Sequence, residues 1–389
     1  MLYPLTLCGA PDLYSEMLRI GCSPQGARYM QDKLSALTLK ITDLTGTCAI
    51  VLKEEALSAG AECALPRETI LKPRQKYAVL LLATRRQLQK IRTKLKSQLF
   101  GELRALAENL KTYCAEPRPP RPPVIMGILN VTPDSFSDGG RYAAPAQAVA
   151  HGLALLRAGA QIIDIGGETT KPGAPEISAR EELRRTIPVI KALRARKPRA
   201  VISIDTTKKA VALAAVQAGA QIINDVSGLT GDPELAGIAA RHQARLILMH
   251  RTGASKVMQR KTRYAELLTD ILQFLARSVS TAQNYGMPLQ NIIVDPGIGF
   301  GKTPEQNLYL LKNLQAFRSL GCAVLLGASR KSVIGQTLQK PVEQRLAGTI
   351  ATSLAGVLGQ VDYLRVHDAA ENLDAVKMFC AIRQSKNKD

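Results

Sequence analysis

The sequence predicts an α/β chain in which a small α/β N-terminal domain precedes a (β/α)8 TIM barrel. The first observation is a regular alternation of strand-like and helix-like segments, which repeats eight times over about 265 residues; a barrel of this kind needs about 250. The second is an almost verbatim repeat of one joint, at 158–164 and 218–224, where a glycine ends a helix before a β-branched strand. Both observations favour a closed barrel over an open doubly wound sheet.

A proline-rich stretch at residues 116–123 marks the predicted boundary between the two parts. It contains five prolines, which lack an amide hydrogen and favour the polyproline II conformation. Neither a helix nor a central strand can continue through it. We therefore expect a semi-rigid linker at 116–123, between a domain of unknown function at 1–115 and a barrel at 124–389.

In the N-terminal domain we expect helices near 11–20 and 45–60, strands near 36–42 and 77–83, and one long basic helix over 85–112. The segment 84–96 carries six basic residues and no acidic one. Its apolar stripe, Leu88, Ile91, Leu95 and Leu99, places the basic residues on the solvent side. A solvated face is the first interpretation, and binding of nucleic acid or of a protein partner is the alternative.

In the barrel we expect strands at 124–129, 161–165, 201–204, 221–223, 245–249, 291–294, 323–326 and 362–366. The helices between and after them are expected near 145–158, 179–195, 208–218, 232–241, 263–286, 304–316, 343–358 and 369–384. Active sites of such barrels lie at the carboxyl ends of the strands.

Every expected strand ends in a residue that can carry charge or form hydrogen bonds. These strand ends are Asn130, Asp164, Asp205, Asn224, His250, Asp295, the stretch from Ser329 to Ser332, and Arg365 with His367. Single groups of this kind often only cap a helix, which is an adequate explanation for Asp225 and Asp368. All eight strand ends together predict a polar pocket at one end of the barrel.

The residue types in this pocket indicate the chemistry of its ligand. Asp205, Asn224 and Asp295 offer acceptors for ring N–H groups, whereas cationic side chains suit phosphate oxygens. The cations are Lys171, Arg330, Lys331 and Arg365. A flat, nitrogen-rich ring with a phosphate ester fits both sets. The sequence contains no P-loop motif, no cluster of metal-binding histidines and no Ser-His-Asp or Cys-His arrangement of neighbouring residues.

Taken in order, the strand-end motifs resemble those of the dihydropteroate synthases over residues 124–384. The matching motifs are ILNVTPDSFSDGG, DIGGETTKPG, SIDT, INDVSG, LMH, VDPGIGFGK, GASRKS and RVHD. The resemblance implies a TIM barrel, usually a homodimer, that uses Mg²⁺. It also implies the reaction: the amine of p-aminobenzoate displaces pyrophosphate from (7,8-dihydropterin-6-yl)methyl diphosphate and gives 7,8-dihydropteroate. Both substrates are small molecules.

The resemblance also implies roles for individual residues. The catalytic group would comprise Asp138, Asp205, Asp295 and Lys331. The pterin would be bound by Asp205, Asn224, Met249, Asp295, Lys331 and Arg365. The diphosphate would be bound by Asn130, Thr170, Arg365 and His367, with Asn130 also touching the metal. The p-aminobenzoate site would comprise Phe136, Thr170, Pro172, Phe300, Lys331 and Ser332.

Three residues depart from the family pattern. Lys171 stands where arginine is common, Ile298 where an aromatic residue is common, and Arg251 where an apolar residue is common. Lysine cannot make the bidentate contact of arginine, so Lys171 bears on substrate affinity rather than on the class of reaction.

Two other functions remain open. One is a methyltetrahydrofolate-dependent methyltransferase serving corrinoid proteins, a related pterin-binding barrel, although such enzymes lack the SFSDGG and SRKS elements present here. The other is a non-catalytic binding protein, motivated by the basic helix and the net charge of +20. A nucleic-acid partner is not expected, because aromatic residues make up only 4% of the chain and tryptophan is absent.

A cytoplasmic location is expected for this chain. It contains no apolar run of about 18 residues that could span a membrane, and its N-terminus does not resemble a secretory signal. The seven cysteines form no CxxC pair, which suits scattered thiols in a reducing compartment.

Overall fold

The computed structural model of the chain describes residues 10–31, 36–115, 121–132, 143–168, 176–253 and 262–385. The chain divides into two compact units, residues 1–119 with 383–389, and residues 120–382. Each unit contains a hydrophobic cluster of its own. The domain limits expected from the sequence, 1–115, 116–123 and 124–389, stay a prediction.

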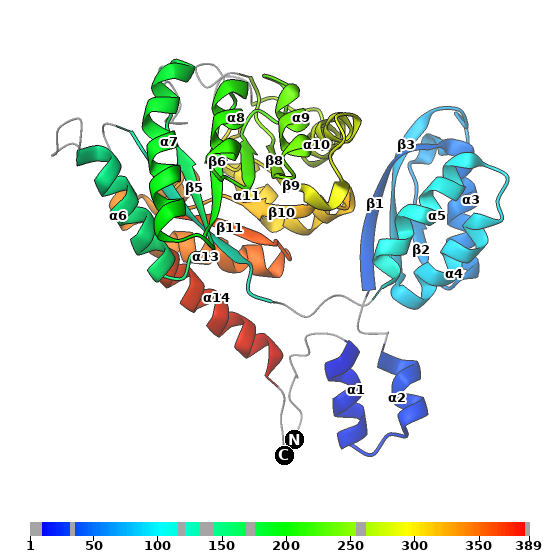
Figure 1. Cartoon of the computed structure of the whole chain (residues 1–389). Helices are drawn as coiled ribbons and strands as arrows, with labels where there is room; N and C mark the ends of the chain where they lie inside the picture. The colour runs from blue at the N-terminus through cyan, green and yellow to red at the C-terminus, as the bar shows by residue number, and fades with distance from the viewer. Residues whose placement is uncertain are drawn as a thin grey trace. The chain divides into compact units, whose positions relative to one another are not determined.

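The first unit contains a three-stranded antiparallel sheet with strand order β1-β3-β2. Helices α3, α4 and α5 cover one face of this sheet (Figure 1). The strands are β1 (Ala36–Thr45), β2 (Glu62–Ala64) and β3 (Lys76–Thr84). The helices are α1 (Ala10–Arg19), α2 (Pro24–Met30), α3 (Gly46–Ser58), α4 (Arg85–Lys96), α5 (Gly101–Cys114) and the short 3₁₀ helix η2 (Arg67–Thr69).

The sequence explains the covered face of the sheet. Along β3 exposed and buried residues alternate, so Val79, Leu81 and Ala83 enter the core. Helix α4 starts with a capping box, in which the Thr84 side chain and the Gln87 side chain each bond the other residue's backbone. Its apolar residues then pack on the sheet.

The single helix expected over 85–112 is wrong, because the structure has two helices, α4 and α5, in this region. Leu99, which was placed in the apolar stripe, is 89% exposed in the turn between them. The turn allows the leucines of α5, namely Leu103, Leu106 and Leu110, to enter the same core as α4. Helix α2 and strand β2 were not predicted.

Three of the six basic residues of α4 form ion pairs within the first unit. Lys94 Nζ lies 3.2 Å from Glu55 Oε2, and Lys96 Nζ lies 3.1 Å from Glu108 Oε1. Arg92 also pairs with Glu108, at 3.6 Å. These ion pairs offset part of the positive charge of the helix, and the choice between a solvated face and a binding surface stays a prediction.

The second unit is a closed barrel, in which the described residues form eight parallel strands ordered β10-β11-β4-β5-β6-β7-β8-β9. This confirms the fold class. The strands are β4 (Val124–Asn130), β5 (Ile162–Gly166), β6 (Val201–Asp205), β7 (Ile222–Asp225), β8 (Arg245–Met249), β9 (Ile292–Asp295), β10 (Ala323–Leu326) and β11 (Tyr363–Val366).

Helices surround the barrel strands, as Figure 1 shows. They are α6 (Ala143–Arg157), α7 (Ala179–Arg196), α8 (Lys209–Gln217), α9 (Glu234–Arg241), α10 (Leu267–Asn284), α11 (Pro304–Lys312), α12 (Ser332–Leu338), α13 (Leu346–Leu358) and α14 (Ala369–Gln384). Three 3₁₀ helices also occur, η5 (Leu289–Asn291), η6 (Leu314–Leu320) and η7 (Val342–Gln344). Helix α12 was not predicted, and the helix expected over 304–316 ends at Lys312.

Alternate residues of the strands enter two different hydrophobic clusters. One set forms a compact apolar plug inside the barrel: Met126, Ile162, Ile222, Ile247, Ile293 and Leu325. Their neighbours along the strands pack outward against the helices. Continuing the inward alternation past the plug leads to Asp164, Asp205, Asn224, Met249 and Asp295. The apolar plug thus forms the floor beneath a polar mouth at the carboxyl ends of the strands.

The two glycine joints also take the predicted form. Gly159 has a φ of 93° and Gly219 a φ of 108°, in the left-handed region that ends a helix. None of the described helices is both long and apolar enough to cross a membrane.

Candidate active site

The structure places the described candidate residues at one end of the barrel, on or just after the strands. They are Asn130, Asp205, Asn224, Met249, Asp295, Phe300, Lys331, Ser332, Arg365 and His367. Four further candidates lie outside the described residues, namely Phe136, Asp138, Thr170 and Pro172. Lys171 lies outside them as well.

Arg365 lies on β11 and bonds side chains of β5 and β6, two strands that are far from it in the sequence. Its Nε donates to Asp164 Oδ2 at 2.6 Å, and its Nη2 donates to Asp205 Oδ2 at 2.8 Å. The side chain of Asp164 is fully buried, that of Asp205 is 8% exposed and that of Arg365 is 18% exposed. Paired burial of this kind keeps the guanidinium in one orientation.

The pKa values of Asp205 and Arg365 are both shifted from their ordinary values. Burial raises the pKa of Asp205 to about 7, and the nearby Arg365 guanidinium offsets only part of this rise. Arg365 itself has a raised pKa, because Asp164 and Asp205 outweigh the effect of burial. One guanidinium therefore pairs with two carboxylates.

Asp295 lies at the end of β9, where Met249 is its direct neighbour on β8. Its Oδ1 accepts the Gly297 amide at 2.7 Å, and burial raises its pKa. The chain after Asp295 folds tightly against β8. A Cβ atom on Gly297, which has a φ of 68°, would lie only 1.9 Å from the His250 carbonyl oxygen. Glycine is required at this position.

Lys331 reaches the loop after β9 from the N-terminus of α12. Its Nζ donates to the Ile298 carbonyl and lies 4.4 Å from the centre of the Phe300 ring. Burial lowers the pKa of Lys331 to about 8, although the nearby Asp295 opposes this shift. The lysine therefore carries a weakly held proton beside an aromatic ring and a carboxylate.

A second lysine, Lys302, bonds the backbone of the same loop after β9. Its Nζ contacts His250 Nδ1 at 2.9 Å and donates to the carbonyls of Gly297 and Phe300, at 2.8 and 3.0 Å. Burial lowers the pKa of Lys302 to about 7 and that of His250 to about 2. Three acceptors satisfy the three donors of an ammonium group, so Lys302 has a structural role.

His367 follows β11 and contacts Ser329, with 2.9 Å between Ser329 Oγ and His367 Nδ1. Burial lowers the pKa of His367 to about 4, and Arg365 and Arg330 lower it further. At neutral pH the ring is uncharged. Arg330 forms a paired contact with Asp368.

Asn130 ends β4 with an exposed side chain beside Gly166 of β5. Its Oδ1 would lie 3.7 Å from a Cβ atom placed on Gly166. The amide oxygen therefore faces the polar mouth. Among the residues that the structure describes, no group of three or more His, Cys, Asp or Glu could hold a metal ion.

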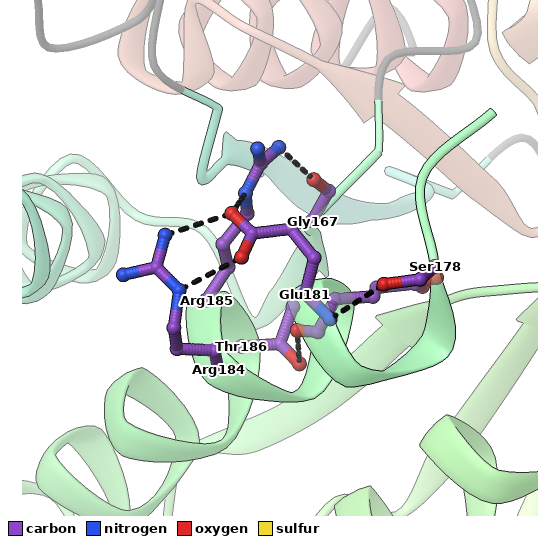
Figure 2. A network of polar contacts seen from close by, with 7 residues as sticks. Gly167, Ser178, Glu181, Arg184, Arg185 and Thr186 are labelled. Carbon is purple, nitrogen blue, oxygen red and sulfur yellow. Dashed lines mark hydrogen bonds and ion pairs between the residues drawn. The ribbon is translucent and has the colours of Figure 1, made fainter. Parts of the chain in front are cut away.

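Helix α7 is tied to the end of β5 by the network in Figure 2. Arg185 donates to Glu181 at 2.7 Å and to the Gly167 carbonyl at 2.9 Å, while Ser178 caps the helix. Next to it Lys208 contacts both Glu168 and the buried Glu182, the latter at 2.7 Å. These contacts hold the backbone at the end of β5 against the start of α7 and of α8.

Asp225 has the structural role that the sequence left open. Its carboxylate accepts the backbone amides of Ser227 and Leu229, at 2.8 and 2.6 Å. It closes a turn. The sequence placed Asp164 among the polar strand ends but did not indicate its contacts with Arg365 and Asn224. Lys302 and Lys208 were given no role from the sequence.

Comparison with known proteins identifies the family. The family model described as pterin binding enzyme matches residues 126–367. The dihydropteroate synthase of Synechocystis sp. is 46% identical over 259 residues, which is 66% of this chain and 88% of the relative. The chain belongs to the dihydropteroate synthase family. The residues before 126 lie outside the family match.

Solved structures of dihydropteroate synthases agree. That of Xanthomonas albilineans with 4-aminobenzoic acid has a TM-score of 0.64 and 41% identity, covering 68% of this chain and 94% of that one. The same enzyme in complex with 7,8-dihydropteroate has a TM-score of 0.62 and 39% identity, covering 68% and 95%.

Proposed function

We propose that this chain condenses (7,8-dihydropterin-6-yl)methyl diphosphate with p-aminobenzoate, giving 7,8-dihydropteroate and pyrophosphate. One observation carries the proposal beyond family membership. Three buried acceptors, Asp205, Asn224 and Asp295, lie at the same barrel mouth as the donors Lys331 and Arg365. This pairing suits a ring rich in N–H groups that carries an anionic leaving group.

The pterin ring is bound above the apolar plug. Asp205, Asn224 and Asp295 accept its N–H groups, Lys331 donates to it, and Met249 packs against its face. Because these groups are buried, a ring that lacked their hydrogen bonds would leave each of them unpaired, at a cost of roughly 1–3 kcal/mol per group. The mouth thus selects for the pattern of donors on the ring.

The reaction begins with cleavage of the C–O bond between the pterin methylene and the diphosphate. Both bonding electrons leave with pyrophosphate, and the remaining carbocation is delocalised into the dihydropterin. The carboxylates of Asp205 and Asp295 stabilise this positive charge. The p-aminobenzoate amine then attacks the methylene carbon and loses a proton. The anilinium formed by this attack is acidic enough to give its proton to water, so no buried general base is assigned.

The leaving group is stabilised by fixed donors. Arg365 keeps guanidinium N–H groups available beyond those held by Asp164 and Asp205, because the fork has five in total. His367 and Asn130 complete the diphosphate side, together with Thr170 outside the described residues. Because the pKa of His367 is lowered to about 4, it contributes a neutral hydrogen bond rather than a charge.

Mg²⁺ is proposed as the metal, and Asn130 as its protein ligand. A single exposed amide oxygen at the mouth suits an ion that arrives with the diphosphate, since Mg²⁺ in such sites keeps several waters and uses few protein ligands. When bound, the ion would neutralise charge on the leaving pyrophosphate.

The p-aminobenzoate side is proposed to lie at Phe300, Lys331 and Ser332, completed by Phe136, Thr170 and Pro172, with Asp138 on the loop after β4. The cation-to-ring contact of Lys331 with Phe300 keeps an aromatic face beside an ammonium, which suits an aromatic carboxylate. A homodimer and a cytoplasmic location stay predictions.

The proposal is tested by product analysis with the purified chain, both substrates and Mg²⁺. We expect 7,8-dihydropteroate in amounts equal to the pyrophosphate released. Methyltetrahydrofolate with a corrinoid acceptor serves as the alternative substrate pair. Methyl transfer without dihydropteroate formation would replace the proposal with the methyltransferase reading, and folded protein that does neither would favour a binding role.

A further inference from the structure

Asp164 is a buried carboxylate to which the reaction above assigns no part. It lies on β5 at an inward-facing position, two residues before the strand ends, and its side chain is fully buried. One oxygen, Oδ2, accepts both Arg365 Nε at 2.6 Å and Asn224 Nδ2 at 3.1 Å. Among the described residues its other oxygen has no hydrogen-bond partner. Asp164 therefore touches two of the groups that bind substrate.

The contact with Asn224 decides which way the amide points. The Asn224 amide nitrogen donates to Asp164 Oδ2, so the amide nitrogen faces Asp164. The amide oxygen then faces away from Asp164, where it can act only as an acceptor. Without Asp164 the amide could turn over and present two donors to the ring. Such a turn would replace attraction to a ring N–H with repulsion.

The contact with Arg365 decides the direction of the guanidinium. Asp164 holds Nε and Asp205 holds Nη2, so two carboxylates on neighbouring strands fix the planar fork at two points. Removing one of them leaves a single contact about which the group can rotate. Its remaining N–H groups would then no longer converge on the diphosphate.

We infer that Asp164 is a positioning residue that sets the pterin-acceptor face of Asn224 and the diphosphate-donor face of Arg365 together. The inference rests on the proposed function, since it concerns the substrate of that reaction. Asp164 does not touch the substrate. Through its Oδ2 atom it orients Asn224, which binds the pterin ring, and Arg365, which binds the diphosphate. The p-aminobenzoate side is unaffected.

The chain offers a matched control in Ser203. This serine lies directly opposite Asp164 on β6, is fully buried and, among the described residues, its hydroxyl likewise has no hydrogen-bond partner. Changing it disturbs the same layer of the barrel without touching Asn224 or Arg365. An effect of Asp164 that came only from packing would appear at Ser203 as well.

The test compares Asp164→Ala with Ser203→Ala in the full chain. Asn at 164 could keep both contacts through its amide oxygen, so the variant used is Asp164→Ala, which removes the acceptor. For Asp164→Ala we expect the KM for the pterin diphosphate to rise by about ten- to a hundredfold. The KM for p-aminobenzoate should stay within about twofold. Ser203→Ala should match the wild type in both constants. Equal changes in both KM values, or an equal effect of Ser203→Ala, would overturn the inference.

Calorimetric binding of the pterin diphosphate separates this inference from the proposed function. If the wild-type chain binds it without turnover, the proposed reaction fails, while weaker binding by Asp164→Ala still supports the positioning role. If the wild type does not bind it, both fail. Unchanged binding by Asp164→Ala in an active enzyme overturns the inference alone.

An exchange of donor and acceptor between positions 164 and 224 keeps the inference testable if Asp164→Ala folds poorly. Asn224→Asp alone places two carboxylates face to face and should bind the pterin diphosphate far more weakly. In the double variant Asp164→Asn with Asn224→Asp, the new amide at 164 donates to the new carboxylate at 224. We expect at least about tenfold recovery of affinity over Asn224→Asp. No recovery would contradict the role assigned to Asp164.

Discussion

At the scale of single residues, the mouth of the barrel depends on two protonation states. Asp205 must be ionised to pair with Arg365 and to accept a ring N–H, whereas Lys331 must be protonated to donate. Burial raises the pKa of the first to about 7 and lowers that of the second to about 8. The competent form therefore exists in a narrow range around neutral pH.

This arrangement predicts a bell-shaped pH profile for kcat/KM of the pterin diphosphate. The value should rise as pH increases through about 7, where Asp205 ionises, and fall as pH passes about 8, where Lys331 loses its proton. Lys331→Arg should move the alkaline limb upward, because arginine stays charged. Steady-state rates from pH 5.5 to 9.5, roughly one unit or more beyond each limb, test this. A profile that is flat between 6 and 9 would contradict it.

The candidate residues differ in how far the sequence could predict them. Four residues stand at the ends of expected strands in recognisable motifs: Asp205, Asn224, Asp295 and Arg365. Locating the strands was therefore enough to predict that these side chains lie close together. Asp164 and Arg365 are 201 residues apart, and their contact depends on closure of the barrel. No local pattern encodes it.

At the scale of elements, ion pairs of Lys208 join the start of α8 to α7 and to the end of β5. Lys208 and Lys209 are neighbours at the start of α8, yet their environments differ. Lys208 pairs with Glu182, whose side chain is 1% exposed, and with Glu168. Lys209 pairs with Glu234, and both of those side chains are about half exposed.

We predict that Lys208→Met lowers the free energy of unfolding by about 2–4 kcal/mol, because it leaves the Glu182 carboxylate buried without its partner. Lys209→Met, the matched control, should leave the free energy of unfolding unchanged, because water screens an exposed pair. Urea unfolding of the two variants checks this. Equal effects of the two substitutions would show that burial of Glu182 is not what matters.

The turn after β9 gives a second element-scale prediction. Gly297→Ala should destabilise the chain by about 2–5 kcal/mol, from the left-handed backbone and from overlap with the His250 carbonyl. In Gly231→Ala the new Cβ would lie 3.4 Å from its nearest atom, Ser227 Oγ, so this variant serves as the control. Thermal unfolding of both variants measures the difference. A Gly297→Ala variant as stable as the control would refute the close approach.

Helices and strands were predicted well where the spacing of apolar residues in the sequence matches the residues buried in the structure, as in the strands of the barrel. The long helix expected over 85–112 failed because Leu99 fits a helical stripe by spacing but lies exposed in a turn. Spacing alone cannot show that a chain reverses so that two helices share one core. Tertiary packing overrode the local pattern there.

At the scale of the whole molecule, every described candidate residue belongs to the second unit. The first unit has its own core, and the basic residues Arg92, Lys94 and Lys96 of its helix α4 pair with acidic residues inside it. We therefore predict that a fragment comprising residues 120–389 keeps kcat/KM for both substrates within about threefold of the full chain. Heparin retention of both forms provides a parallel readout.

A folded fragment that loses more than about tenfold in kcat/KM would show that the first unit contributes to the site. Loss of heparin retention together with unchanged turnover would assign the first unit a separate binding role. Circular dichroism establishes folding of the fragment before either comparison.

The measurement that tests the central claim most directly is pyrophosphate release by the purified chain, with and without p-aminobenzoate, repeated with Asp295→Asn. We predict release that requires p-aminobenzoate and falls by about a hundredfold or more in the variant, because buried ring donors lose their acceptor. Release that does not depend on p-aminobenzoate, or an Asp295→Asn variant as active as the wild type, would contradict the account.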